Sequence, residues 1–396
     1  MSAAALAACA VVLGASGRVS LNASGALGPT ASPVSTPSVT AATPATSPSV
    51  TPAASPRSLT VVSSGDILLH ERTWNQAKRD AQGKGMNFAP QFADVAPLIQ
   101  GADLALCHLE TPIAPAGGPY EGYPTFSVPP QIIPAIVATG FDMCGTASNH
   151  SFDQGSAGIR RTLDALDAAG LPHTGSARSK AESTRPLVMT VATRTGTVRV
   201  GIVAFTYGFN GIDYPQGHTW AANVIDAPAI IAAAKACRDA GADIVIAKLH
   251  WGTEYTSTPN SAQRSLARTL ADSGQIDLVD GAHSHSVQPI EHIGRMWVIY
   301  SHGNLIAAHR EPTTIKSEGV ISRWTFTEQP DGNFTITSVE VAPTLITDSV
   351  PVRVLDTARD LRSGHWVATT QARLRQAQRR TMSTINALGA DAALID

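Results

Sequence analysis

The sequence has no excess of basic residues and few charged residues of either sign. Among 396 residues, 29 Lys and Arg stand against 31 Asp and Glu, so the formal net charge is -2 and only 15% of residues are charged. A protein that grips a nucleic-acid backbone needs clustered positive charge, so we expect no nucleic-acid partner. The hydrophobic share of 43% is enough for a proper core, and the length allows one large α/β domain or two ordinary domains.

Long apolar runs and cysteines are also scarce. Beyond the first few residues, no uncharged apolar run approaches the roughly 18 residues that span a bilayer, which excludes a polytopic membrane protein. The cysteines at positions 9, 107, 144 and 237 are too few and too scattered for a disulfide scaffold, and none forms a C-x-x-C metal clip. Cys107 and Cys144 fall inside predicted strands and are most simply buried. If those strands are neighbours, a disulfide can form in an oxidising compartment.

Residues 1–20 have the character of an export leader. Residues 3–14 form a short apolar stretch without the basic start of a complete signal peptide, so we expect a truncated leader and a missed upstream start. The LAAC string at residues 6–9 resembles a bacterial lipobox, in which the cysteine is lipidated; a chance cysteine in an alanine-rich stretch is the alternative. We expect an exported protein, either a membrane-anchored lipoprotein or one that is secreted or displayed at the cell surface.

Residues 21–57 are predicted to be a disordered linker. No charged residue occurs between Arg18 and Arg57, and Ser, Thr, Ala, Val, Gly and Pro make up nearly all of the stretch. Recurrent prolines and few large apolar groups favour an extended, partly polyproline chain. Such a spacer suits an exported domain held away from a membrane or within a cell wall; a disordered tail of a cytosolic protein is the alternative.

One pattern recurs from Leu59 onward: a helical segment ends at a glycine, a short apolar strand follows, and polar residues appear where the strand stops. Glycine suits the left-handed conformation at a helix C-terminus. Alternating helices and apolar strands predict an α/β fold whose parallel strands are buried on both faces and covered by helices. The glycines that end these helices are Gly101, Gly140, Gly241 and Gly274.

Further segments complete the folded part. We assign residues 58–345 to one domain and residues 346–396 to a helical extension of the same domain, because the linker-like composition does not return; a separate C-terminal domain is the alternative. The further segments are a hairpin at 186–192 and 198–205, a strand at 296–300, antiparallel strands at 319–327 and 333–342, and a helix at 369–387.

Polar residues follow the predicted strands at the point where each strand ends. Because ligand sites in open α/β sheets form outside the carboxyl ends of the strands, we expect these side chains to converge in one cleft. Carboxylates, an amide and imidazoles make a divalent-metal set of mixed oxygen and nitrogen ligands that needs no thiolate. The strand-end residues are Asp66, His108, Glu110, Asn149, His150, His250, His283 and His285.

This set predicts metal-assisted chemistry. Two divalent ions held about 3.5–4 Å apart by a shared carboxylate would activate a bridging water and clamp a phosphoryl group. The i, i+2 pair His283 and His285 lets one loop present both rings to such a pair. His150 is placed to protonate a leaving oxygen, and Asp153 to orient that histidine. Each residue alone is more simply a surface, capping or turn residue, but their joint appearance at successive strand ends favours a site.

The remaining histidines carry less weight. His302 lies at a strand end near the expected cleft, so we keep it as a candidate lining residue. The others are expected to be exposed or structural, namely His70, His173, His218, His292, His309 and His365.

Several ordered strings between residues 59 and 304 make the sequence similar to a known family. They resemble the bacterial capsule synthesis protein family CapA, also called the poly-γ-glutamate biosynthesis protein PgsA family. That family is similar to the calcineurin-like metallophosphoesterases, which implies a four-layer α/β/β/α sandwich with a two-metal site. The strings are GDILL at 65–69, LETP at 109–112, SNHSFDQG at 148–155, HWGTEY at 250–255, GAHSHSVQP at 281–289 and SHGN at 301–304.

The resemblance implies a role for each matched residue. One metal would lie at Asp66 and His285, the other at Asn149, His250 and His283, with Glu110 in the place of the bridging carboxylate and His150 as the catalytic histidine. Cleft shaping or substrate contact is implied for Trp251, Glu254, Gln288 and Asn304.

Two departures from the family pattern affect the first metal site. The Asp-x-His that opens the phosphoesterase pattern is absent, because Leu68 occupies the histidine position and removes one ligand. His108 stands where the family usually has asparagine before Leu-Glu. Three interpretations of His108 stay open: a replacement ligand, a substrate-contacting residue, or a change of no consequence.

Two functions from different classes follow. The first is an exported hydrolase with two divalent ions, manganese, zinc or iron, that cleaves a phosphoester, or an amide or ester of an anionic envelope polymer. The second is a nonhydrolytic accessory protein that binds or passes on poly-γ-glutamate or a similar polymer, within a membrane biosynthesis or export complex. The clustered strand-end ligands argue against a third function, that of a purely structural wall protein.

Overall fold

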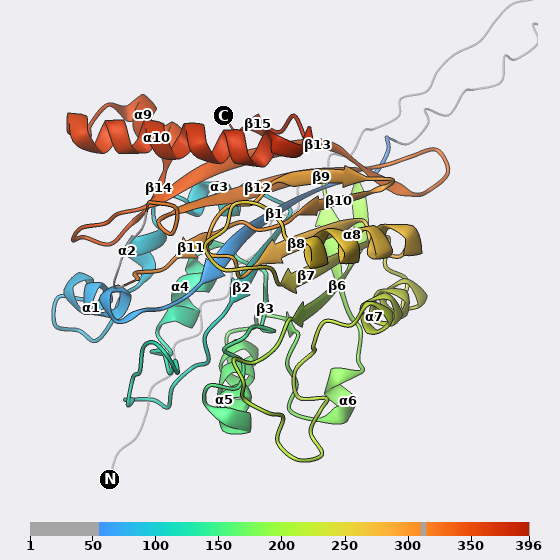
Figure 1. The fold of residues 1–396 in the computed structure, drawn as a ribbon, viewed down its shortest axis with the longest axis horizontal. Helices are drawn as coiled ribbons and strands as arrows, with labels where there is room; N and C mark the ends of the chain where they lie inside the picture. The colour runs from blue at the N-terminus through green and yellow to red at the C-terminus, as the bar shows by residue number, and fades with distance from the viewer. Residues whose placement is uncertain (1–54, 310–313, 396) are drawn as a thin grey trace, which may run out of the picture. The chain divides into compact units, whose positions relative to one another are not determined.

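The computed structural model describes residues 55–309 and 314–395. The predicted leader, and the predicted linker up to residue 54, lie outside the described residues. Figure 1 shows β-sheets at the centre of the described part, with helices on their outer sides.

The first sheet contains nine strands, which are β1 (Ser58–Ile67), β2 (Leu104–Leu109), β3 (Met143–Gly145), β4 (His173–Thr174), β11 (Asn304–Ile306), β12 (Glu318–Glu328), β13 (Phe334–Ile346), β14 (Val354–Asp356) and β15 (Ala393–Leu394). Their order is β14-β13-β12-β1-β2-β3-β4, with β11 paired to β1 and β15 to β13. Strands β1 to β4 run parallel, as the helix–glycine–strand pattern predicts. The antiparallel pair predicted from residues 319–342 is confirmed by β12 and β13.

The second sheet contains six strands, which are β5 (Leu187–Thr193), β6 (Gly196–Thr206), β7 (Ile244–His250), β8 (Leu278–Ala282), β9 (Ile290–Ile293) and β10 (Met296–Ile299). Their order is β5-β6-β7-β8-β10-β9. The four central strands run parallel, and β5 and β9 close the two edges in antiparallel pairing. The hairpin of β5 and β6 is the one that the sequence predicts.

The helices are α1 (Glu71–Asp80), α2 (Ala89–Phe92), α3 (Ala96–Gln100), α4 (Ile132–Thr139), α5 (Gly155–Ala168), α6 (Lys180–Ser183), α7 (Ala227–Asp239), α8 (Ser261–Ser273), α9 (Thr357–Ser363) and α10 (Ala368–Ile385), with a 3-10 turn η1 (Asn386–Leu388). Gly140 and Gly274 end α4 and α8 with φ of 105° and 65°, as expected for left-handed caps. Gly101 differs. It ends α3 with φ of -79°, because the right-handed turn continues and its N–H bonds to Pro97.

Adjacent residues of the central strands face opposite cores. Val61 packs between the two sheets, whereas its neighbour Val62 packs against the helices α1 to α5 on the outer side of the first sheet. In the second sheet, Ile246 faces the first sheet and Val245 faces α7 and α8. This alternation follows from the period of two along a strand. It produces four layers, helices, sheet, sheet and helices, and confirms the α/β/β/α sandwich.

The layering also corrects one expectation. Helices do not cover both faces of the parallel strands, because the inner face of each sheet is covered by the other sheet. A buried apolar strand needs an apolar surface on each side, and either a helix layer or a second sheet provides it.

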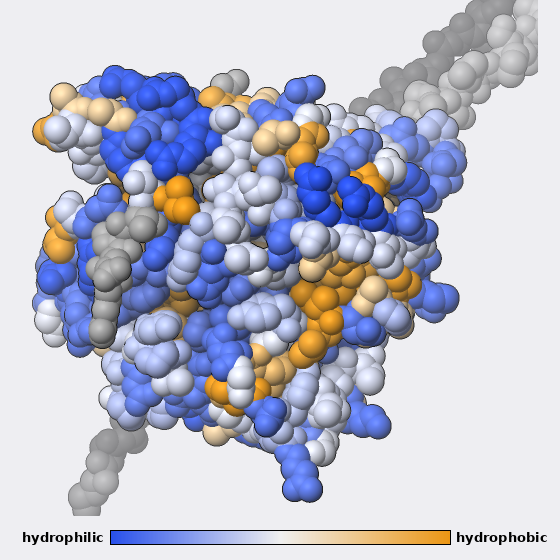
Figure 2. All heavy atoms as spheres, viewed as in Figure 1, coloured by the Kyte–Doolittle hydropathy of each residue, from blue (hydrophilic) through white to orange (hydrophobic). Residues whose placement is uncertain are grey.

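The C-terminal segment packs on the first sheet. The predicted helix at 369–387 appears as α10, which contacts β13 together with α9. Strands β14 and β15 join the edge of the same sheet, so the segment after residue 345 is not wholly helical. The outer face of α10 is largely hydrophilic in Figure 2. Within residues 55–309 and 314–395, no helix combines the length and the apolar character that a membrane span requires.

Cys107 and Cys144 lie on neighbouring strands, which is the condition for a disulfide between them. They lie opposite each other on the paired strands β2 and β3, with Cα atoms 4.5 Å apart, and they are joined by a disulfide. Cys237 is a buried free thiol.

Candidate functional site

The strand-end residues come together where both sheets end. Asp66 lies in β1 and Glu110 directly after β2, both in the first sheet. His250 ends β7 and His283 and His285 follow β8, in the second sheet. All five side chains are buried. The site is therefore shared between the two sheets, and the convergence follows from the parallel strands ending on the same side.

Glu110 lies at the centre of this cluster. Its Oε1 is 3.7 Å from His285 Nε2 and 3.8 Å from His250 Nε2. Asp66 Oδ2 is 3.2 Å from His285 Nδ1, and Asp66 Oδ1 is 3.8 Å from His108 Nε2. Three groups of side chains each bring their ligating atoms within 4.8 Å of one another. The groups are Asp66–His108–His250, Asp66–Glu110–His285 and Glu254–His283–His285.

Several of these atoms are buried without a hydrogen-bond partner. Both carboxylate oxygens of Glu110, together with His108 Nδ1 and His283 Nδ1, have none among residues 55–309 and 314–395. A buried carboxylate without a compensating partner is costly, and a divalent cation removes that cost. Carboxylate and imidazole donors are the ligands that zinc, manganese and iron accept. The cluster is therefore compatible with divalent metal ions.

The charges of the cluster depend on burial and on one another. Burial raises the pKa of Glu110 well above its ordinary value. Burial also opposes ionisation of Asp66, but the hydrogen bond and charge of His285 outweigh it and lower the pKa of Asp66. For His285, burial alone would lower the pKa, and the charges of Glu110 and Asp66 raise it to about 9. The buried carboxyl groups of Asp66 and Glu110 thus share the positive charge of one imidazolium, that of His285. A bound cation would stabilise their ionised forms.

The loop after β8 has an unusual backbone. His283 and His285 have φ of 90° and 50°, in the left-handed region that residues with a Cβ rarely occupy. The His283 N–H donates to Asp66 Oδ2 at 3.2 Å, and His285 Nδ1 lies 2.9 Å from Asn304 Oδ1. Strained loops of this kind concentrate at functional sites. These contacts fix the loop against β1 and β11.

His150 and Asp153 form the contact expected from the sequence. His150 Nδ1 lies 2.7 Å from Asp153 Oδ2, and the same oxygen accepts the N–H of Phe126 at 2.7 Å. The Phe126 ring packs edge-on against the imidazole, with ring centres 4.7 Å apart. Because the carboxylate only accepts, Nδ1 carries the proton and Nε2 is the nitrogen left for proton exchange.

Asn149 and His108 lie on either side of His250. The Asn149 Oδ1 is 2.8 Å from His250 Nε2, and His108 Nε2 is 2.9 Å from His250 Nδ1. Leu68, at the position where the phosphoesterase pattern has histidine, is buried. His108, on the neighbouring strand β2, has its Nε2 3.8 Å from Asp66 Oδ1.

A cavity of about 1010 Å³ opens beside the cluster. Of the predicted residues, it is lined by Asn149, His150, Asp153, Glu254 and His285.

Two histidines in this lining correct the sequence analysis. His70 and His309 were expected to be exposed or structural, yet both line the cavity, with ring centres 4.6 Å apart. Burial lowers the pKa of His70 to about 4 and that of His309 to about 2, so both are neutral. Each lies three residues past a strand, β1 and β11. The rule that site residues follow the ends of strands, here called the strand-end rule, fits both positions. It could not be applied to His309, because the three-residue β11 has no recognisable pattern in the sequence.

Three other predicted contact residues support the loops around the cavity. The Asn304 side chain bonds to His285, as described above. Trp251 is buried in the core of the second sheet, and its Nε1 donates to the Tyr300 carbonyl at 2.9 Å. Gln288 is buried and donates to the Thr256 carbonyl at 3.0 Å. Neither Trp251 nor Gln288 is among the lining residues of the cavity.

His302 also lies away from the cavity. It is fully buried, with Nδ1 3.1 Å from the Gly281 carbonyl and 3.2 Å from Asp280, and Nε2 2.7 Å from Ser322 Oγ. Asp280 in turn pairs with Lys248 at 2.5 Å, in an ion pair that the sequence analysis missed. In the sequence, a single Lys or Asp within an apolar strand gives no sign of its partner. The ion pair becomes visible only when the neighbouring strand is known.

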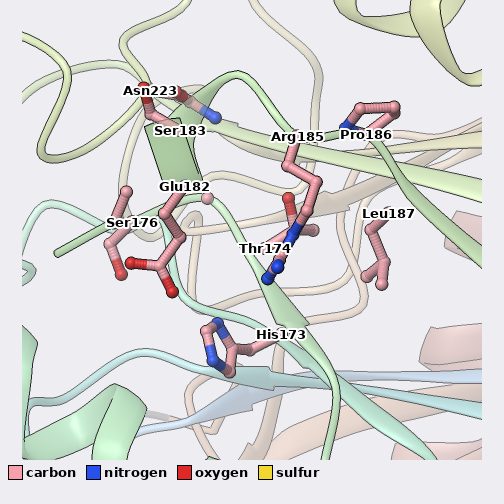
Figure 3. Close-up of a pocket in the computed structure, with 11 residues that line it drawn as sticks. His173, Thr174, Ser176, Glu182, Ser183, Arg185, Pro186, Leu187 and Asn223 are labelled. Atoms are coloured by element: carbon pink, nitrogen blue, oxygen red, sulfur yellow. The ribbon is translucent and has the colours of Figure 1, made fainter. Parts of the chain in front are cut away.

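A smaller hollow of about 60 Å³ lies beside β4 and the start of β5. Figure 3 shows His173, Glu182 and Arg185 around it. None of the predicted metal ligands lines this hollow.

Curated relatives of this chain include proteins from two Bacillus species. The "PGA biosynthesis protein CapA" of Bacillus subtilis is 24% identical over 283 residues, which cover 70% of this chain and 70% of the relative. The "Capsule biosynthesis protein CapA" of Bacillus anthracis is 26% identical over 257 residues, which cover 63% of this chain and 59% of the relative.

Among solved structures, a calcineurin-like phosphoesterase of Bacillus subtilis matches with a TM-score of 0.44 at 15% identity, covering 83% of this chain and 98% of that chain. The four-layer architecture itself rests on the sheets and cores described above.

The family model described as "Bacterial capsule synthesis protein PGA_cap" matches residues 60–309. This stretch begins in β1 and ends at His309, so it contains every predicted metal ligand and the histidine–aspartate pair at the cavity. The chain belongs to the bacterial capsule synthesis protein family PGA_cap.

Proposed function

We propose that this protein is an exported, metal-dependent hydrolase that acts in capsule or poly-γ-glutamate biosynthesis. Its substrate is a phosphoester, or an amide or ester bond of an anionic envelope polymer. The observation that carries the proposal is the buried carboxylate of Glu110. Neither of its oxygens has a hydrogen-bond partner in the part of the chain that the structure describes, and Oε1 lies within 3.8 Å of both His250 and His285. The names of the two Bacillus relatives support the biosynthetic process.

Two divalent ions, manganese, zinc or iron, would occupy the cluster. When bound, such ions act as Lewis acids and activate water. Their ligands would be Asp66 and His285 for one ion and Asn149, His250 and His283 for the other, with Glu110 shared and His108 available to the first.

The chain itself supplies the proton and holds it in place. His150 lines the cavity with its Nδ1–H bound to Asp153, so Nε2 is the nitrogen that exchanges protons. As the imidazolium, with a proton on each ring nitrogen, His150 would give the Nε2 proton to a leaving oxygen or nitrogen and return to the neutral Nδ1–H form. The Phe126 N–H fixes Asp153 from the other side, which prevents the imidazole from turning away.

Export is part of the proposal. The disulfide between Cys107 and Cys144 supports folding in an oxidising compartment, because cytosolic thiols are kept reduced. The leader and the proline-rich linker predicted from the sequence support attachment at, or release from, the cell surface. The partners would be the envelope polymer and a membrane biosynthesis or export complex.

A nonhydrolytic accessory function is the second candidate. The cavity of about 1010 Å³ is far larger than a single phosphoryl group requires and suits a segment of polymer. A metal pair binds carboxylates as well as phosphates, so the same cluster would anchor such a polymer without cleaving it.

Metal content tests the proposal first. The full chain, an Asp66→Ala/His283→Ala double variant and the control His292→Ala would be compared by elemental mass spectrometry. His292 lies in β9 against Trp297, away from the cluster. We expect divalent ions in the parent and the control and their loss in the double variant.

Turnover then separates the two functions. The substrates are bis(4-nitrophenyl) phosphate and a γ-glutamyl oligomer. A parent that takes up no metal, even after reloading with manganese, zinc or iron, would overturn the hydrolase. A metal-loaded parent that binds the oligomer but cleaves neither substrate favours the accessory function.

A further inference from the structure

Two cationic side chains line the same cavity as His309 and His285. Arg72 and Lys316, here called the cationic wall, both line the main cavity and also share a small adjoining hollow. Arg72 belongs to α1 and Lys316 to the segment before β12, so the fold brings together residues that are far apart in the sequence. Both are half-buried.

Lys316 is held next to the cluster by its neighbours. Its Nζ lies 3.9 Å from the centre of the Tyr255 ring, within the range of a cation–π contact. Tyr255 is fixed in turn, because its N–H donates at 2.7 Å to the carbonyl of Ser284, between the two loop histidines. The Lys316 carbonyl accepts from Asn304 Nδ2 at 2.9 Å. The ammonium is therefore positioned relative to His285, whose ring centre is 5.9 Å from that of Tyr255.

Arg72 makes one side-chain hydrogen bond within residues 55–309 and 314–395. Its Nη2 donates to the carbonyl of Asp348 at 2.9 Å. This bond fixes the guanidinium but supplies no full negative charge. The cation thus keeps most of its capacity for a charged acceptor.

Several half-buried arginines of the described part are paired, whereas Arg161 and Arg264 are half-buried and unpaired but do not line the cavity. Arg178, Arg238, Arg353 and Arg373 each form an ion pair with a carboxylate. Within residues 55–309 and 314–395, neither Arg72 nor Lys316 has a carboxylate within 4.0 Å. A half-buried cation left without a counter-charge in a cavity is a place where an anionic ligand gains binding energy.

We infer that Arg72 and Lys316 bind a second anionic group, a carboxylate or a phosphate, of a ligand whose first group lies at the metal cluster. The inference rests on the proposed function only in placing that first group. The cationic wall then selects chains that carry repeated negative charges over molecules with a single one. Arg72 and Lys316 are specificity-determining residues, and neither takes part in bond cleavage.

The test is equilibrium binding to the metal-loaded full chain, followed by fluorescence anisotropy. Four labelled probes are used: a γ-glutamyl tetramer, a glycerol-phosphate tetramer and the single unit of each. The variants are Arg72→Met and Lys316→Met, with Arg72→Lys and Lys316→Arg as charge-retaining partners. Lys84→Met is the matched control, because Lys84 is exposed and does not line the cavity.

We expect each methionine variant to bind one of the tetramers roughly three- to tenfold more weakly, the range for one charge-assisted contact at a half-buried site. Single units should bind the parent and the variants alike. The charge-retaining variants and Lys84→Met should keep most of the parent affinity. The tetramer that responds identifies the anion as carboxylate or phosphate.

Two results would overturn the cationic wall. One is a methionine variant that binds both tetramers as tightly as the parent does, and the other is a parent that binds tetramers no better than single units. Metal content measured on the same samples keeps the two proposals apart. A parent that holds metal but binds neither tetramer overturns the wall alone, whereas a parent without metal overturns the proposed function.

Discussion

Two histidine–aspartate pairs occupy very different regions of this molecule. His150 and Asp153 are 2.7 Å apart and line the cavity. His302 and Asp280 are 3.2 Å apart and lie between the two sheets, where their side chains are 0% and 2% exposed. The residue types are the same and the contacts are similar, so the surroundings decide what each pair does.

The buried pair is neutralised by its neighbours. Asp280 also accepts from Lys248 and from Ser63, each at 2.5 Å. Burial would raise the pKa of Asp280, but the charge of Lys248 outweighs it and lowers that pKa. Burial lowers the pKa of His302. An ion pair, a neutral imidazole and no opening to solvent suit a structural contact, whereas the cavity pair keeps one ring nitrogen for chemistry.

The largest expected effect comes from breaking the cavity pair. His150→Gln should lower turnover by roughly 10²- to 10⁴-fold, because the proton donor is lost. The free energy of unfolding should fall by only about 1 kcal/mol, since one hydrogen bond is removed. Initial rates with bis(4-nitrophenyl) phosphate and urea denaturation measure the two quantities.

The matched change His302→Gln should give the opposite result, lower stability with the turnover of the folded protein largely unchanged. If His302→Gln abolished turnover at full stability, the division of roles between the two pairs would be wrong.

The second effect comes from removing one partner of the buried ion pair. Asp280→Leu leaves the Lys248 ammonium buried without its counter-charge, which should cost about 3–5 kcal/mol of unfolding free energy. Urea denaturation at pH 7 measures the loss. The control is Asp239→Leu, which breaks an exposed pair with Lys235 of almost equal length, 2.7 Å against 2.5 Å. That change should cost about 0.5 kcal/mol or less. Equal losses in the two variants would contradict the role assigned to burial.

The smallest effect is expected when both buried charges are removed together. Lys248→Met/Asp280→Leu should unfold within about 1 kcal/mol of the parent at pH 7, because neither charge is left unpaired.

The double variant should also respond less to acid. The folded-state pKa of Asp280 is below its ordinary value of 3.8, so its ionised form stabilises the fold above that pH. The contribution is lost as the pH falls through the lower folded-state value. The double variant lacks it and should therefore lose less stability than the parent between pH 5 and pH 3, as urea denaturation at each pH would measure. An equal loss in both proteins would show that Asp280 contributes nothing to acid sensitivity.

The strand-end rule explains why much of the site was predictable. Asp66, Glu110 and His250 lie at or directly after the ends of apolar strands that the sequence makes plain, and all three lie in the cluster. His309 follows the three-residue strand β11, whose pairing with β1 depends on residues more than 200 positions away. The lining of the cavity by Arg72 and Lys316 is equally non-local. A local sequence pattern cannot predict a contact between distant residues that forms only in the folded chain.

His302 shows the limit of the same rule. It follows β10 in the way that His250 ends β7, yet one histidine reaches the cluster and the other lies between the sheets. Side chains alternate between the two faces of a strand, and the sequence does not say what covers each face.

The sequence by itself determined the α/β class, the parallel strands, the hairpin of β5 and β6, and the side of the sheets on which the polar residues gather. These features depend on local periodicity and on the direction of the strands. The tertiary structure decided that the two sheets pack face to face, that Cys107 pairs with Cys144, and which histidine–aspartate pair reaches the cavity. Those outcomes depend on which element packs on each face of a sheet, and that is decided only when segments far apart in the sequence pack together.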